Sequence, residues 1–83
     1  MQSFLNLRSH LSTLASDNEV GFAFAEFFSS LGTVNSADRF FGLGEPNRRY
    51  FLIQFKDSAD AMKATSKYKL RSFGFNGVLI ELN

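Results

Sequence analysis

The segment RRYFLIQF, residues 48–55, constrains the fold of this chain more than any other stretch. Side chains on a β-strand alternate between the two faces of a sheet, so Phe51, Ile53 and Phe55 form one wholly apolar face. An apolar face of this kind must pack against another layer of the protein. The opposite face mixes aromatic, aliphatic and amide groups, and its members are Tyr50, Leu52 and Gln54. The segment therefore predicts a strand with one buried face and one face available for binding.

The length of the chain predicts a single domain spanning residues 1–83. A chain of 83 residues is too short to build two separate cores. Its 45% hydrophobic residues predict a folded protein, and no apolar run approaches the roughly 20 residues that cross a bilayer. We therefore expect no membrane partner, and a nuclear or cytoplasmic location. The alternative of a targeting role for residues 1–16 rests on their lack of acidic residues, and Arg8 is the single arginine among them.

Charge is distributed unevenly along the chain. Residues 1–47 carry a net charge of −3, whereas residues 48–83 carry +4. The basic half predicts either a local patch for an anionic partner or a solvated helix face with spaced lysines. The sequence alone leaves both interpretations open.

A helix is predicted over about residues 17–31. Ser16 and Glu19 have the spacing of a capping box, and Gly32 is suited to the left-handed conformation that ends a helix. The competing interpretation is a strand, because Val20, Phe22 and Phe24 alternate with small residues. The capping signals at both ends favour the helix.

The remaining segments predict further strands and a second helix. Residues 33–43 and 50–55, joined by the turn cluster GEPN, predict an antiparallel hairpin. Residues 57–70 predict a helix, and residues 78–82 predict a closing strand. At the N-terminus, Phe4, Leu7, Leu11 and Leu14 have helical spacing, while SFLNL also alternates as a strand. Context favours a short strand at residues 3–8.

This order of elements predicts the α+β class. The expected architecture is a ferredoxin-like βαββαβ sandwich, a four-stranded antiparallel sheet with two helices on one face. The other face of the sheet is expected to remain open.

Three motifs of the chain, in the expected order, resemble the RNA recognition motif family. FSSLGTVNSA at residues 28–37 is similar to the end of that family's first helix, FKDSADAMKA at 55–64 to its entry into the second helix, and FNGVLIEL at 75–82 to its closing strand. RRYFLIQF is similar to the family's signature strand, with Arg48 in the basic position and Tyr50 in that of the first stacking aromatic residue. Arg49, Phe51 and Leu52 depart from that pattern.

The resemblance implies a single RNA recognition motif-like domain that binds short single-stranded RNA on its open sheet face. Phe4 and Tyr50 would stack on bases, Arg48 and Arg49 would contact phosphates, and the amides of Asn6 and Gln54 would bind base edges. The predicted RNA-binding residues are Phe4, Asn6, Arg48, Arg49, Tyr50, Leu52 and Gln54.

The alternative is a degenerate domain of the same fold that mediates a protein–protein interaction. Leu52 takes the place of the second stacking aromatic residue, and an exposed patch of Phe4, Tyr50, Leu52 and Leu79 suits a protein's apolar side chains. Phe73 and Phe75 would either pack the bend before the last strand or supply a further stacking or docking ring.

Residues for catalysis or metal binding are not apparent in the sequence. The chain has no cysteine, and its single histidine, His10, has no partner at ligand spacing. The GLG of residues 42–44 lacks the lysine and hydroxyl residue of a phosphate-binding loop. We therefore expect that the protein is not an enzyme and that it binds neither a metal ion nor a cofactor.

Overall fold

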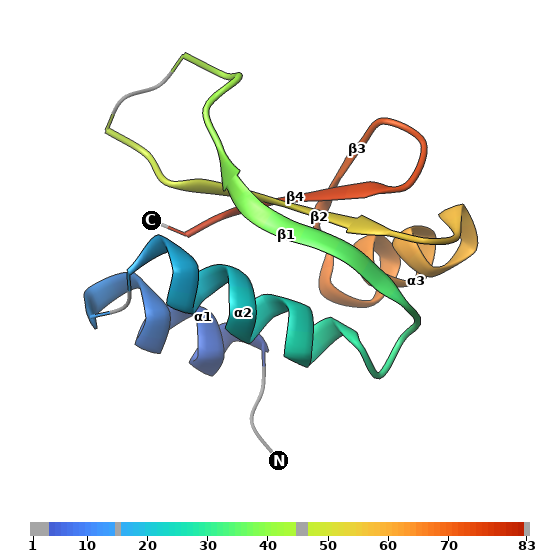
Figure 1. Ribbon diagram of the computed structural model, residues 1–83, viewed down its shortest axis with the longest axis horizontal. Helices are drawn as coiled ribbons and strands as arrows, with labels where there is room; N and C mark the ends of the chain where they lie inside the picture. Colours follow the sequence, from blue (N-terminus) through green and yellow to red (C-terminus); the bar gives the residue numbers. More distant parts are fainter. Residues whose placement is uncertain (1–3, 15, 45–46, 83) are drawn as a thin grey trace.

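The computed structural model describes residues 4–14, 16–44 and 47–82. Over these residues it contains three helices and one four-stranded antiparallel sheet (Figure 1). In chain order the elements are α1 (Phe4–Leu14), α2 (Asp17–Phe28), β1 (Val34–Phe40), β2 (Tyr50–Phe55), α3 (Ser58–Tyr68), β3 (Arg71–Phe73) and β4 (Gly77–Glu81). The predicted α+β class and the antiparallel sheet are confirmed, with three helices where two were expected.

The sheet is built from two hairpins joined along its middle. Its strand order is β1-β2-β4-β3. β1 pairs with β2, with Phe40 opposite Tyr50, and β3 pairs with β4, with Phe73 opposite Gly77. β2 and β4 pair antiparallel in the centre. The predicted βαββαβ order needs a strand before the first helix, and among the described residues a helix occupies that place, so the observed element order differs from the prediction.

A strand was predicted for residues 3–8, but residues 4–8 lie in helix α1, so the prediction is wrong for these five residues. Residue 3 lies outside the described residues. Phe4, Leu7 and Leu11 are all buried in the core. A strand would place Phe4 and Leu7 on opposite faces, whereas helical spacing turns all three side chains to one side. Packing against the core therefore selects the helical alternative.

The N-terminus of α2 is fixed by the predicted capping box. The Ser16 hydroxyl accepts a hydrogen bond from the Glu19 backbone N–H at 3.3 Å, and the Glu19 carboxylate accepts one from the Ser16 N–H at 3.1 Å. The helix then buries Val20, Phe24 and Phe28. This confirms the helix and excludes the strand alternative for this segment.

The end of α2 differs from the prediction. The helix stops at Phe28, and Gly32 does not adopt the left-handed conformation. A Cβ atom at position 32 would overlap the carboxylate of Asp60, so the glycine is required by a close approach of α3. A left-handed backbone conformation does occur at the end of α3, where Lys69 has φ 55° and ψ 49°. Nothing in the sequence indicated it, because this residue is not a glycine.

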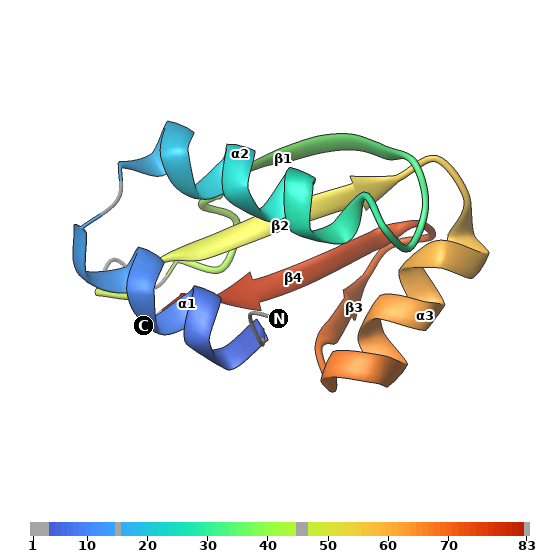
Figure 2. The ribbon, with the colours of Figure 1, turned by 90° about the horizontal axis from the view of Figure 1, so that it is seen from below.

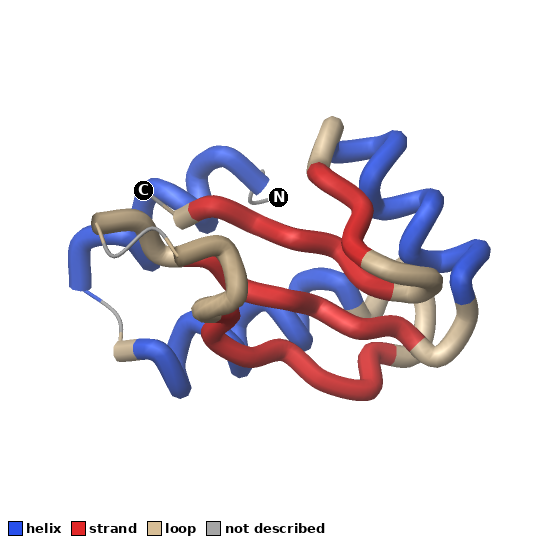
Figure 3. The backbone as a smooth tube through the Cα atoms, turned by 90° about the horizontal axis from the view of Figure 1, so that it is seen from above, coloured by secondary structure: helices blue, strands red, loops and turns tan. Residues whose placement is uncertain are grey.

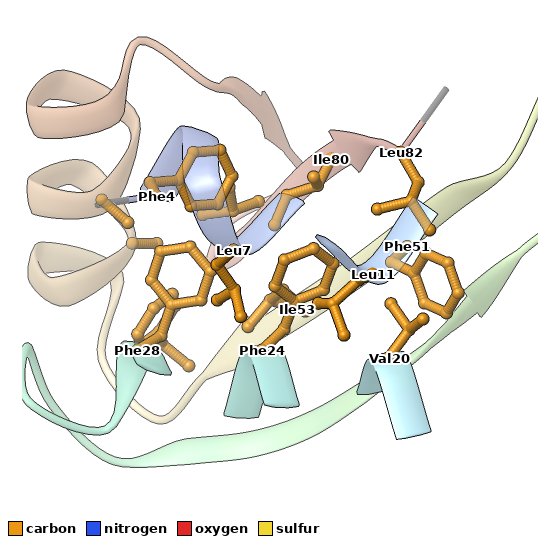
Figure 4. Packing of buried hydrophobic residues seen from close by; sticks show 14 residues of the cluster. Phe4, Leu7, Leu11, Val20, Phe24, Phe28, Phe51, Ile53, Ile80 and Leu82 are labelled. Carbon is orange, nitrogen blue, oxygen red and sulfur yellow. The ribbon is translucent and has the colours of Figure 1, made fainter. Parts of the chain in front are cut away.

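The predicted division of β2 into two faces is confirmed. Phe51, Ile53 and Phe55 are fully buried in the core, where Figure 4 shows Phe51 and Ile53 between side chains of α1, α2 and β4. Tyr50 is not part of this cluster. The phenylalanines of β2 therefore face the helices, and the tyrosine faces the other way.

All three helices contribute to one face of the sheet. α1 and α2 lie side by side across it, and α3 lies beside β3 (Figure 2). Tyr68 of α3 packs on Phe4 of α1, with ring centroids 5.3 Å apart, and on Phe28 of α2 at 5.7 Å. An aromatic cluster thus joins the three helices to one another above the sheet.

Candidate binding surface

The face of the sheet that points away from the helices, called here the outer face, is defined by strand register. Paired residues of neighbouring strands share a face, and side chains alternate along each strand. The outer-face residues are Ser36, Asp38, Phe40, Tyr50, Leu52, Gln54, Arg71, Phe73, Gly77, Leu79 and Glu81. In Figure 3 the helices lie behind the sheet, and no helix of the described chain crosses this face.

The middle of the outer face is apolar and is closed over from both edges. Phe40 of β1 and Phe73 of β3 belong to opposite edge strands, yet their ring centroids are only 4.8 Å apart. The two edges must therefore curl toward each other over the central strands. Accordingly Tyr50 is only 7% exposed and Leu79 only 3% exposed. The outer face is a second, smaller apolar layer, with Leu52 half-buried in its centre.

Two connections rise beside the outer face, the β1–β2 connection and the β3–β4 turn (Figure 1). Each carries an exposed phenylalanine: Phe41 is 74% exposed and Phe75 is 85% exposed. Each also contains a glycine with a left-handed backbone, Gly44 at φ 69° and Gly74 at φ 68°. Exposed aromatic rings of this kind are enriched at binding interfaces.

A pocket of about 490 Å³ lies at the end of the outer face, against the β1–β2 connection. Its lining residues are Arg39, Phe40, Phe41, Leu43, Gly44, Arg48 and Tyr50. The pocket thus combines three aromatic rings with two guanidinium groups.

The arginines near this end of the sheet are held by carboxylates. Asp17 of α2 accepts hydrogen bonds from Arg49 at 2.6 Å and from Arg39 at 3.2 Å. Glu81 pairs with Arg48 at 3.0 Å. The hydrogen bond from Arg49 lowers the pKa of Asp17, and Arg39 adds to this effect, while desolvation opposes it. Asp17 therefore ties β1 and the start of β2 to the first turn of α2.

This ion-pair cluster predicts a small acid-dependent loss of stability. A carboxylate whose pKa is lower in the folded state contributes stability above its unfolded pKa, and that contribution is lost as pH falls through the folded value. The free energy of unfolding should fall less between pH 7 and pH 3 in Asp17→Asn than in the wild type. The difference between the two falls should be at most about 1 kcal/mol, because the Asp17 side chain is 44% exposed and its charge is screened by solvent. Urea unfolding at both pH values measures the difference.

The control for this prediction is Asp38→Asn, which removes an exposed carboxylate outside the cluster. That variant keeps Asp17 and both of its arginine partners, so the part of the acid-induced loss that Asp17 causes should remain. Equal losses in the wild type and in Asp17→Asn would contradict the role given to Asp17.

The structure separates the seven predicted RNA-binding residues into two groups. Arg48, Tyr50, Leu52 and Gln54 lie on or beside the outer face, where Gln54 accepts a hydrogen bond from Ser36 at 2.9 Å. Phe4 and Asn6 lie on α1, on the helix side, and Phe4 is 6% exposed among other aromatic rings. Arg49 points to Asp17 and lies over the ring of Phe51, also on the helix side.

The predicted placement of Phe4, Asn6 and Arg49 on the open sheet face is therefore wrong. Phe4 cannot form a stacking platform with Tyr50, because the body of the sheet separates them and Phe4 is part of the core. The predicted exposed patch of Phe4, Tyr50, Leu52 and Leu79 is wrong for the same reason, and Tyr50 and Leu79 are themselves buried. The aromatic residues that do reach this surface include Phe40, which we did not predict; its signal is its place opposite Tyr50 in the predicted hairpin.

Comparisons with protein-family models, with curated proteins and with solved structures give no match to this chain. Within the described ranges no group of three or more His, Cys, Asp or Glu side chains is arranged to hold a metal ion. No helix in the same part of the chain has the length and apolar character to cross a membrane. The outer face and its pocket are therefore the features of this molecule that indicate a function.

Proposed function

We propose that the protein is a binding module whose outer face docks an apolar segment of another protein. The observation that carries this proposal is the partly exposed apolar strip formed by Phe40, Leu52 and Phe73, which lies on a sheet face that no described helix crosses. The exposed rings of Phe41 and Phe75 extend the strip on the two flanking connections. Such an aromatic-rich surface is typical of a protein interface.

The charges around the strip indicate the chemistry of the partner. Two acidic side chains, Asp38 and Glu81, and two basic ones, Arg48 and Arg71, lie around the strip. Their charges sum to zero, and Arg48 and Glu81 form an ion pair with each other. A nearly neutral rim offers little attraction to the phosphates of a nucleic acid, whose binding depends on several unopposed cations. It suits an apolar peptide segment with few charges.

The proposal can be tested by selecting peptides from a random displayed library on the wild-type protein. The selected peptides should be rich in apolar residues. When they bind, the NMR signals that shift in the protein should be those of backbone amides in β2, β4 and the rest of the outer face. Leu52→Glu should weaken their binding at least about tenfold, because it places a charge in the centre of the strip.

The matched control is Ser66→Glu, which adds the same charge at an exposed position of α3. Because Leu52 is half-buried, Phe75→Ser supplies a second variant at an exposed site where folding is not at stake. Selected peptides that bind wild type, Leu52→Glu and Phe75→Ser equally would contradict the proposal, and so would a library that yields no binder.

Single-stranded RNA binding is a second candidate function. Its supporting observation is the group of exposed or partly exposed rings, Phe73 and Phe75, on the hairpin that also carries Arg71. The resemblance of residues 55–64 and 75–82 to the RNA recognition motif family adds to this support. In this candidate the β3–β4 hairpin takes the stacking role that was predicted for Phe4 and Tyr50.

Titration of a labelled random oligonucleotide pool distinguishes this candidate from protein docking. RNA binding predicts affinity that falls with salt, and a further loss in Arg71→Ala and Phe75→Ala. Protein docking predicts no salt-dependent binding of the pool. Ser66→Ala, which removes no ring or charge, is the control.

A further inference from the structure

One row of side chains crosses all four strands of the outer face. Its members, paired in register from β1 to β3, are Asp38, Leu52, Leu79 and Arg71. Paired residues of neighbouring strands share a face and lie level with one another. The row therefore has an acid at the β1 edge of the sheet, two leucines in the middle and a base at the β3 edge.

The two charged side chains that end this row have no counter-charge within the described part of the chain. Asp38 and Arg71 are both exposed, and neither forms an ion pair there. Arg39, which follows Asp38 on β1, faces the helices and pairs with Asp17 at 3.2 Å. Glu81, another acid of the outer face, already has an arginine partner. Asp38 and Arg71 can therefore pair with charges of a bound partner.

An aromatic pair covers the middle of the row. Phe40 and Phe73 belong to the rows on either side of it, and their ring centroids are 4.8 Å apart, so the two rings meet over the row between them. Accordingly Leu79 is only 3% exposed, and Leu52 is half-buried. A partner thus meets an aromatic surface with an acid on one side and a base on the other.

We propose that the apolar segment docked on this face carries two opposite charges, a basic side chain that pairs with Asp38 and an acidic side chain that pairs with Arg71. The apolar residues between these charges rest on the rings of Phe40 and Phe73. This inference rests on the proposed docking function and adds to it the charge pattern of the partner.

The width of the sheet limits the spacing of the two charges in the partner. Asp38 and Arg71 stand on the two edge strands, three strand spacings apart. Three spacings amount to about 14 Å in a flat sheet, and the curl of this sheet shortens the distance. An extended segment rises about 3.4 Å per residue, so its two charges would be about four positions apart. Such positions lie on the same face of an extended segment.

Peptide selection from a random displayed library gives the first test. Peptides selected on the wild type should carry an acid and a base on either side of their apolar residues. Selection on Arg71→Glu should return two bases, and selection on Asp38→Lys should return two acids, because each variant reverses one exposed charge of the row. Lys63→Glu makes the same kind of reversal at a 63% exposed site on α3 and should return the acid–base pattern.

Two related peptides give the second test. One is a selected acid–base peptide, and the other is its variant with lysine in place of the acid. The wild type should bind the acid–base peptide about three- to tenfold more tightly, because the lysine replaces an exposed ion pair with Arg71 by repulsion. Arg71→Glu should show the opposite preference. A peptide with two bases cannot regain the lost pair by binding in the reverse direction, because its ends have the same charge.

Three results would overturn this proposal. Selected peptides would lack the acid–base pair, Arg71→Glu would keep the preference of the wild type, or Lys63→Glu would reverse that preference as fully as Arg71→Glu does. In all three cases the docking function would still stand if the selected apolar peptides lose affinity for Leu52→Glu, so the two failures are distinguishable. A library that yields no binder would overturn both.

Discussion

Phe4→Ala is expected to lower the free energy of unfolding by about 3 to 4 kcal/mol, within the range for removal of a buried aromatic side chain. Phe4 is 6% exposed, and its ring contacts those of Phe24, Phe27, Phe28 and Tyr68 at centroid distances of 5.3 to 6.1 Å. The substitution would leave a cavity where the three helices meet. A loss of this size is a large part of the stability of a small domain.

The same substitution should loosen α1 in particular. The helix has only 11 residues, and an isolated helix of that length is marginal in water, so its order depends on the packing of Phe4, Leu7 and Leu11. Urea unfolding measures the total loss, and amide hydrogen exchange measures local opening of α1. Leu5→Ala is the control, because Leu5 is 64% exposed on the same helix and should change stability by less than about 0.5 kcal/mol. If Phe4→Ala were as stable as the control, Phe4 would not be part of the core, and the exposed position expected from the sequence would be supported instead.

Gly21→Ala is expected to destabilise the protein by about 2 to 3 kcal/mol, although alanine is the better helix former. In an exposed helix the change would stabilise by about 1 kcal/mol. Gly21, however, is buried where α2 packs on β1, and a Cβ atom at this position would overlap the backbone carbonyl oxygen of Ala37. Backbone cannot rotate away as a side chain can, so α2 must shift from the sheet.

Thermal and urea unfolding of Gly21→Ala measure this effect. Asn18→Ala is the matched control on the exposed side of α2, where the change should be neutral or slightly stabilising. A Gly21→Ala protein at least as stable as the wild type would show that helix propensity outweighs the close approach of α2 and β1.

The elements that were predicted correctly have local signals that agree with their tertiary contacts. The capping box of Ser16 and Glu19 fixes a hydrogen-bonding pattern within four residues, and the alternation in β2 fixes which side chains face the core. Neither signal requires knowledge of the rest of the chain. Both were therefore readable from the sequence.

The elements that were predicted wrongly depend on contacts between distant segments. SFLNL fits both a strand and a helix, and the contact of Phe4 with Tyr68 of α3 decides between them. β3 has three exposed residues and little strand character of its own, and it forms by pairing with β4. Gly32 is required by the approach of Asp60 in α3, and Gly21 by that of Ala37 in β1, and each contact lies outside the segment in which the glycine stands.

The sequence predicted which face of the sheet carries the candidate binding surface, but it did not predict how far the side chains on that face are buried. The alternation of β2 correctly placed Tyr50, Leu52 and Gln54 on the face opposite the core. The burial of Tyr50 depends on the curl that brings Phe40 and Phe73 together, and this curl involves both edges of the sheet. No pattern within β2 could have indicated it.

The packing of α1 has a consequence for the order of events during synthesis. Leu82 belongs to the same buried cluster as Phe4, Leu7 and Leu11, and all four residues are labelled in Figure 4. Its backbone N–H also donates to the carbonyl oxygen of Arg49 at 2.7 Å. The apolar side of α1 is thus fully covered only once residues as far along the chain as Leu82 have been synthesised. Until then we expect that side to be a natural substrate for chaperones that bind apolar helices in nascent chains.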